Sequence, residues 1–309
     1  MNAENNEKHA SSSNVDTFSD AFSDVLRMLR LTVELYHNAK ICGNWMIREN
    51  QVGATCFHLV TEGECCMDVP GYWEGRLHFG DLVIFPHELP HRITSAQQLT
   101  GPQRHLDYQS ARHIQGTGLL CGEMFFQHKG SRYLLDALPP VLIIRHSAEN
   151  AWLSSLLGMI VAESRQTRAA SKVLLDKLSE LLFIHALAQH LADKPNELGV
   201  LSVYTHPRLA KALNAIHQHP EKAWTLELMA AEAALSRTAF AETFKAVSGW
   251  TPGSYLTWWR MQVAWSLLVQ GESVIETAYK VGYQSESAFS RVFKMEFQVT
   301  PGMVRRAGL

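Results

Sequence analysis

The sequence has no long hydrophobic run, no large excess of charge and no secretory signal at its start. None of its 309 residues lies in an uninterrupted apolar stretch of about eighteen, so we expect no transmembrane helix. The formal net charge of −2 excludes a protein that binds nucleic acid through overall charge alone. The polar residues 1–21 are interpreted as a disordered lead-in, and we expect the protein to reside in the cytoplasm.

Cysteine is scarce as well. The five cysteines are Cys42, Cys56, Cys65, Cys66 and Cys121. In the reducing cytoplasm they are expected to be free thiols, which excludes a fold held together by disulfides. Cys65 and Cys66 are adjacent in a strand-like pattern, which predicts that their side chains lie on opposite faces.

The C-terminal third contains a segment that occurs twice. Residues 240–245 (FAETFK) are followed after five residues by TPG at 251–253, and residues 289–294 (FSRVFK) are followed by TPG at 300–302. The offset between the copies is 49 residues throughout. Two copies at a constant offset predict two small structural units that lie side by side.

Each copy predicts two helices joined by a tight turn. Apolar residues recur with helical spacing at 226–233 and again at 274–281. Ser236 and Ser285 are predicted to cap the second helix of each copy, which is the helix-turn-helix pattern. Residues 254–270 are predicted to be one connecting helix that fixes the separation of the units. Its expected apolar stripe is Leu256, Trp259, Val263 and Leu267.

The second copy also carries a long spaced signature. Its residues are Ile275, Ala278, Val281, Gly282, Tyr283, Ser287, Phe289, Ser290, Arg291, Phe293, Lys294, Thr300 and Pro301. Together with the duplication, this signature resembles the DNA-binding domain of the AraC/XylS family of transcription regulators. The resemblance implies an all-α domain over residues 206–309 that binds promoter DNA. The chain departs from the family at Gln298, where the first copy has Gly249 and the family usually has glycine.

The faces opposite the inward phenylalanines are free to contact DNA. The expected contact residues are Ser236, Arg237, Thr238, Ala241, Glu242 and Lys245 in the first unit, and Ser285, Glu286, Ser287, Ser290, Arg291 and Lys294 in the second. Most of these side chains can read base edges, whereas the lysines, with Arg305 and Arg306, are better placed for phosphates. From His206 onward 5 Lys and 6 Arg stand against 8 Glu and no Asp, so a modest basic bias lies in this domain.

Residues 22–147 are predicted to form a β-domain. Short runs of Val, Ile, Phe and Thr separated by glycines are typical of a barrel or jelly roll. Two stretches resemble the motifs of the cupin family: Gly53-x4-His58-x5-Glu64, with Val60 in place of the second histidine, and Gly80-x5-Pro86-x4-His91, with Glu88 in place of the second glycine. The resemblance implies a cupin-like β-barrel, which is the common sensor half of AraC-type regulators.

Helices are predicted between the two domains. Residues 133–140 are interpreted as an apolar loop, and amphipathic helices follow at 151–164 and 171–192. The resemblance implies that the segment 148–194 forms a homodimer; the alternative is that the helices only cover the barrel. Residues 195–205 are interpreted as a linker. The fold class is therefore α+β, with a cupin-like barrel, a helical dimerisation segment and two helix-turn-helix units.

A metal site in the cupin domain would need three or four ligands. His58, His91 and Glu64 are the candidates, and Zn²⁺ is the ion that suits them, although the predicted function requires no cofactor. Because the second histidine of the usual cupin set is missing, we predict no enzyme activity. A metal-dependent cupin enzyme fused to a DNA-binding domain is the alternative.

The signal is the least specified part of the prediction. Cys42, Gly43 and Trp45, with one histidine in each cupin-like motif, form a layout similar to that of AraC-type regulators that respond to reactive chlorine species. This likeness implies Cys42 as a redox-sensing thiol, so that replacing Cys42, His58 or His91 by alanine abolishes induction without loss of DNA binding. The alternative signal is an organic small molecule in the barrel.

The combined prediction is a sequence-specific transcription regulator. We expect an activator that binds double-stranded promoter DNA as a homodimer, contacts RNA polymerase and has no membrane partner. The cupin-like domain is expected to sense the signal, interpreted as an oxidant or a metal.

Overall fold

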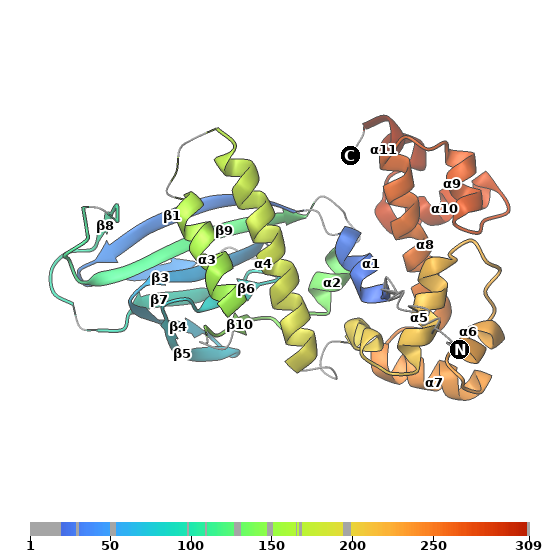
Figure 1. The fold of residues 1–309 in the computed structure, drawn as a ribbon, viewed down its shortest axis with the longest axis horizontal. Coiled ribbons are helices and arrows are strands. Elements are labelled where there is room, and N and C mark those ends of the chain that lie inside the picture. Colours follow the sequence, from blue (N-terminus) through green and yellow to red (C-terminus); the bar gives the residue numbers. More distant parts are fainter. Residues whose placement is uncertain are drawn as a thin grey trace, which may run out of the picture.

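The computed structural model describes residues 20–28, 31–49, 54–97, 99–108, 110–126, 131–146, 151–164, 166, 169–193 and 199–307. The lead-in expected at residues 1–21 lies almost entirely outside them. Within the described residues a sheet-rich N-terminal half is followed by a helical C-terminal half (Figure 1). Among the described residues no helix has both the length and the apolar character needed to cross a bilayer.

The N-terminal half contains two antiparallel sheets. The larger sheet has the strand order β10-β6-β3-β9-β1-β8, and the smaller has the order β2-β7-β4-β5. The strands are β1 (Leu31–Cys42), β2 (Met46–Glu49), β3 (Thr55–Glu62), β4 (Glu64–Val69), β5 (Trp73–His78), β6 (Leu82–Phe85), β7 (His91–Ser95), β8 (Arg104–Leu106), β9 (Gly116–Phe126) and β10 (Leu142–Ile144). The domain is cupin-like as predicted, and its described strands form a two-sheet sandwich rather than one closed barrel.

The larger sheet is covered on both faces. Nearly every residue of β3 is buried, because one face of this strand meets the smaller sheet and the other meets helices. Cys56 and Val60 point into the core between the sheets, whereas Phe57 and Leu59 join the core under the helices. In β4, buried and half-buried residues alternate, because the outer face of the smaller sheet meets solvent.

Helices α3 (Ala151–Ser164) and α4 (Ser171–Asp193) lie across the larger sheet (Figure 1). The apolar pattern at 171–192 predicts one stripe, with Leu178 and Leu182 in the dimer contact. The structure corrects this assignment: Leu182 is fully buried against the sheet, while Leu174 and Leu181 are exposed. The two helices therefore have a face that packs on the sheet and a second apolar face that meets solvent.

The C-terminal half consists of short helices. They are η1 (Gly199–Tyr204, a 3-10 helix), α5 (Leu209–Gln218), α6 (Leu226–Glu232), α7 (Arg237–Ser248), α8 (Pro252–Val269), α9 (Val274–Lys280), α10 (Glu286–Phe297) and α11 (Pro301–Ala307). The linker predicted at 195–205 is structured over its second half, because Val200, Leu201 and Val203 of η1 are buried. Helices α6–α7 and α9–α10 are the two predicted helix-turn-helix units.

Helix α8 is the connecting helix, and it belongs to both units. Trp259 in its first half lies in the core that contains Phe240, and Trp265 in its second half lies in the core that contains Phe293. Buried side chains surround the helix, so the single predicted stripe was too narrow, and Val263 is only half-buried. Because each half of α8 is part of a different core, the helix holds the two units at a fixed separation.

Two short helices of the N-terminal half contact the helical domain. They are α1 (Ala21–Met28) and α2 (Ser131–Asp136), which lie between the two halves in Figure 1. The Ala21 N–H donates a hydrogen bond to Asn214 Oδ1 at 2.7 Å. The ring of Tyr133 lies 5.2 Å from that of Trp250. Tyr133 is thus part of a helix at the domain contact, and not of the apolar loop that the sequence predicted.

Candidate DNA-binding surface and sensor interior

The two candidate reading helices, α7 and α10, begin in the same way. The Ser236 hydroxyl accepts a hydrogen bond from the Ala239 N–H at 3.2 Å, and the Ser285 hydroxyl accepts one from the Ala288 N–H at 3.3 Å. Both serines have extended backbone, which is the geometry of an N-cap. The predicted caps are therefore present in both units.

The buried face of each reading helix leaves the opposite face in solvent. Phenylalanines at 240 and 244 in α7, and at 289, 293 and 297 in α10, are at most 1% exposed. None of the twelve predicted contact residues is buried. Ala241 and Ser290 are half-buried, and the other ten are exposed: Ser236, Arg237, Thr238, Glu242, Lys245, Ser285, Glu286, Ser287, Arg291 and Lys294. The structure thus brings the predicted residues onto two corresponding solvent faces.

The arginines of the two faces differ in their surroundings. Arg237 Nε lies 3.1 Å from Glu227 Oε1 of α6, and both side chains are more than half exposed. An exposed pair of this kind contributes little stability, so DNA could replace Glu227 at small cost. Arg291 has no ion-pair partner within the described residues. Of the two arginines on the predicted reading faces, Arg291 is therefore the one without an ion-pair partner among the described residues.

The structure also identifies a positioning residue that the sequence did not indicate. Arg260 of α8 donates from Nε to the Pro220 carbonyl and from Nη2 to the Lys222 carbonyl, both at 2.8 Å. Its guanidinium lies against Gly282 and over the ring of Tyr283, in the turn of the second unit. Arg260 therefore ties the turn of one unit to the segment before the other. A single arginine in an apolar helix gives no sequence signal of such a contact.

Arg305, predicted to contact phosphate, is exposed and makes one hydrogen bond within the domain. Its Nε donates to the Gly271 carbonyl at 3.2 Å, in the turn that follows α8. The arginine thus satisfies a carbonyl at a helix end, which competes with its predicted contact to phosphate.

In the sensor half, the two cupin-motif histidines do meet. His58 Nε2 and His91 Nε2 are 2.9 Å apart, and His91 Nδ1 lies 2.8 Å from the Leu89 carbonyl. Because a carbonyl only accepts, His91 Nδ1 donates to Leu89 and its Nε2 accepts from His58. His58 Nδ1 is then a buried acceptor without a partner, as the structure shows. Burial lowers the pKa of both imidazoles, and the charge of His91 lowers the pKa of His58 further.

Glu64, the third predicted metal ligand, does not join these histidines. It begins β4 in the other sheet, where its carboxylate lies 3.3 Å from Arg76 and 3.4 Å from His78. The described residues contain no group of three His, Cys, Asp or Glu side chains that could hold a metal ion. The expected set of His58, His91 and Glu64 is therefore not assembled, and these residues do not fit a zinc site.

All five cysteines are free thiols. Cys42, the predicted redox residue, is fully buried beside Gly116. Burial raises the pKa of the Cys65 thiol to about 12 and raises those of Cys56 and Cys121 as well. Cys66 is partly exposed, so it lies on the opposite face of its strand from Cys65, as predicted.

The chain has a cupin-like sandwich followed by two helix-turn-helix units with exposed polar faces. This combination defines the class of transcription regulators that carry a separate sensor domain. Comparisons with known proteins support this assignment. Residues 20–192 match the cupin family model, and residues 229–307 match the helix-turn-helix domain model.

The similar proteins give the family. The chain is 30% identical over 292 residues to RclR of Escherichia coli, an RCS-specific HTH-type transcriptional activator, covering 93% of this chain and 97% of the relative. It is 29% identical over 304 residues to the HTH-type transcriptional regulator AlkR of Acinetobacter baylyi, covering 93% and 99%. A solved structure of the DNA-binding domain of AdpA with a target DNA is 28% identical, with a TM-score of 0.31 over 32% of this chain and 89% of that one. The protein belongs to the AraC family of transcription regulators.

Proposed function

We propose that the protein binds promoter DNA through helices α7 and α10, which enter successive segments of the major groove about 34 Å apart. The observation that supports this most is the duplication itself: two capped reading helices with exposed polar faces are joined by α8, whose halves are buried in two cores. Relatives named as HTH-type regulators and activators are consistent with the same role.

Within this proposal the contact residues have separate roles. Arg237 and Arg291 bond base edges, for which a guanidinium and the acceptors of guanine are suited. Lys245 lies about two turns after Arg237, Lys294 lies about one turn after Arg291, and both lysines contact phosphates. Smaller polar residues of the two faces adjust to the bases beside them.

The proposed active form is a homodimer that assembles through the exposed apolar face of α3 and α4. This face contains Trp152, Met159, Val173, Leu174 and Leu181, which are 43 to 61% exposed. Apolar side chains gathered on two adjacent helices favour a partner surface. A symmetric dimer would place four reading helices on one promoter, and we propose that it acts in the cytoplasm by contacting RNA polymerase.

The proposed signal is an organic small molecule that binds the cupin-like domain. The relative named as RCS-specific makes an oxidant the second candidate. Oxidants attack accessible thiolates, however, and four of the five thiols are buried. Glu64 does not lie with His58 and His91, so the three do not form a set of metal ligands. This favours a regulator without catalytic activity rather than a metal-dependent cupin enzyme.

Footprinting of the purified full-length protein on its own promoter region tests the proposal. We expect protection in pairs of adjacent major-groove segments on one face of the duplex, and a second such pair for the partner subunit. One short protected segment per subunit would show that only one reading helix contacts DNA.

A further inference from the structure

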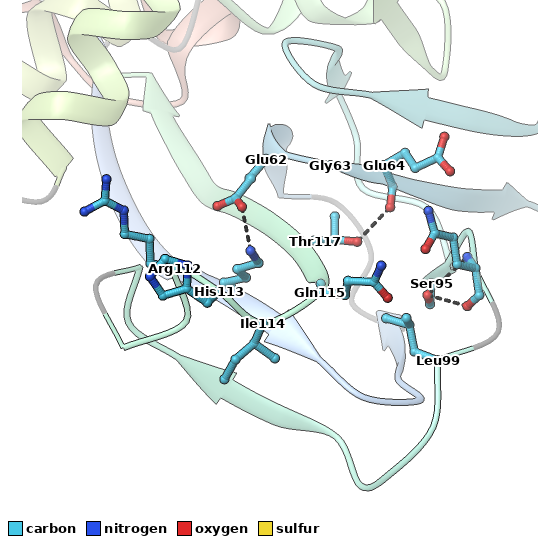
Figure 2. Close-up of a pocket in the computed structure, with 13 residues that line it drawn as sticks. Glu62, Gly63, Glu64, Ser95, Leu99, Arg112, His113, Ile114, Gln115 and Thr117 are labelled. Carbon is cyan, nitrogen blue, oxygen red and sulfur yellow. Dashed lines mark hydrogen bonds and ion pairs between the residues drawn. The ribbon is translucent and has the colours of Figure 1, made fainter.

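The sandwich contains a polar hollow whose lining includes neither His58 nor His91. It has a volume of about 340 Å³ and lies between the end of β1, the β3–β4 turn, the segment after β7 and the loop before β9 (Figure 2). In Figure 1, β1 points toward this end of the molecule, away from the helical domain. Its volume is within the range of small-molecule sites in proteins.

A buried ammonium group lies in the wall of this hollow. Lys40 is 4% exposed, and its Nζ lies 2.5 Å from Glu62 Oε1, whereas the Glu62 side chain is 46% exposed. An ammonium group has three N–H donors, and Glu62 is the acceptor that the described residues provide. Removing a charge from water is costly unless its donors are satisfied. Lys40 therefore retains hydrogen-bonding capacity for a further acceptor in the hollow.

The lining carries two cations, Lys40 and Arg112, and two carboxylates, Glu62 and Glu64, and both carboxylates are already paired. Glu62 is neutralised by Lys40, and the Glu64 carboxylate is engaged by Arg76 and His78. Arg112, which also lines the hollow, has no ion-pair partner among the residues that the structure describes. A ligand that matches this lining carries one negative charge.

The other lining side chains indicate the rest of the ligand. Leu99 and Ile114 provide apolar surface and Gln115 provides an amide in the same lining (Figure 2). We propose that this hollow is the effector site of the regulator and that it binds a small organic carboxylate. The carboxylate accepts hydrogen bonds from Lys40 and Arg112, and the apolar body of the ligand packs on Leu99 and Ile114. The inference rests on the proposed function, because it assigns the signal to a site.

Strand β1 connects this site to the helices that the function uses. Two residues before Lys40, the Asn38 amide donates to the Ser164 carbonyl at the end of α3 at 2.8 Å. Further back, the Val33 N–H donates to Asp176 Oδ1 of α4 at 2.7 Å. Helix α1, which precedes β1 and contacts Asn214 of the helical domain, completes the connection. A ligand that engages Lys40 thus acts on a strand that contacts both the proposed dimer helices and, through α1, the DNA-binding domain.

Calorimetric titration of the full-length protein with benzoate and hexanoate tests the site. Benzamide and hexanamide serve as neutral matches, and inorganic phosphate serves as a simple anion. We expect a carboxylate to bind at least tenfold more tightly than its amide, and Arg112→Gln to weaken that binding about tenfold or more. Lys40→Met is expected to have a similar effect, and Arg104→Gln, on exposed β8 outside the lining, is the matched control.

Several outcomes would overturn the assignment. They are no binding of either carboxylate at about 10 mM, equal binding of acid and amide, tightest binding by inorganic phosphate, or unchanged affinity in Arg112→Gln. The same preparations are footprinted on the promoter. Normal footprints without carboxylate binding reject the effector site alone, whereas failure of the footprint rejects the proposed function.

Discussion

Gln298 has the same backbone geometry as Gly249, which lies 49 residues earlier at the equivalent position of the first unit. Both residues end a reading helix in the left-handed region, with φ of 59° for Gln298 and 76° for Gly249. Each N–H donates to the carbonyl four residues back, Lys294 or Lys245, at 2.9 Å. The departure from glycine therefore leaves the helix end unchanged and places a residue with a Cβ in a conformation that favours glycine.

Replacing Gln298 by glycine is expected to stabilise the helical domain. Relief of the left-handed strain outweighs the lost bond from Gln298 to the Met295 carbonyl, so the free energy of unfolding should rise by about 0.5–1 kcal/mol. Gly249→Ala is the reverse control and should lower the free energy of unfolding by about 1 kcal/mol, because the added Cβ meets open space and only the left-handed backbone is strained. Urea unfolding measures both, and a less stable Gln298→Gly would contradict the argument.

Arg291→Ala and Lys294→Ala should affect DNA binding in different ways. Loss of a base-reading arginine should cost about 1–3 kcal/mol at one base pair and relax the preference there. Loss of a phosphate contact should weaken all sequences alike and reduce the salt dependence of binding by about one ion. Competition binding with a library of single-base operator variants separates the two. A uniform loss across the library for Arg291→Ala would remove it from the base readers.

Charge on the exposed face of α3 and α4 should separate the dimer. Leu174→Glu with Leu181→Glu places two carboxylates in the proposed contact, where unpaired charge is costly to bury, while the sandwich core is untouched. Sedimentation should show a folded monomer. Leu182→Glu is the contrasting control, since it buries a carboxylate under the helix and should unfold the domain. A dimer that persists in the double variant would locate the interface elsewhere.

Stability should fall on acidification because of the His58–His91 pair. The folded-state pKa values of both imidazoles are lowered, so below about pH 6.5 the unfolded chain binds protons that the folded chain does not. The contribution of the two imidazoles to the free energy of unfolding is therefore fully present above that pH. As the pH drops, it decreases by up to about 1.4 kcal/mol per pH unit for each imidazole. His58→Asn, which cannot titrate, should show a smaller slope between pH 7 and 5. Equal slopes in urea unfolding would disprove the role of the pair.

The number of solvent-accessible thiols can be measured directly. We expect an aromatic disulfide reagent to react rapidly with Cys66 and slowly with the four buried cysteines. Cys66→Ser should then remove the fast phase, while denaturant should release the remaining thiols. A fast phase that disappears in Cys42→Ser would instead restore Cys42 as a candidate oxidant sensor.

The sequence predicted the helical domain in detail because the duplication repeats each local signal. The caps at Ser236 and Ser285 and the inward phenylalanines depend on residues close in sequence, and the structure confirms them. The membership of the AraC family follows from the same signals. Local patterns of this kind are what a sequence alone can show.

Local patterns of this kind could not predict contacts between segments that are distant in the sequence. Glu64 was grouped with His58 by motif spacing, but the turn at Gly63 moves the chain from one sheet to the other, so their side chains separate. The helical spacing alone does not distinguish Leu182 from Leu181, and only the position of the sheet shows which of the leucines is covered. The hollow beside Lys40 combines four separate segments, and no single stretch of sequence indicates it.

The double burial of α8 has a consequence for how such a regulator changes its targets over evolutionary time. Inserting one residue in the helix would rotate one unit by about 100° relative to the other and disrupt a packed core, so such changes are selected against. Substitutions on the exposed faces of α7 and α10 carry no such penalty. Under the proposed mode of binding, new promoters would be acquired by altering which bases are preferred, while the distance between the two half-sites on the DNA would stay the same.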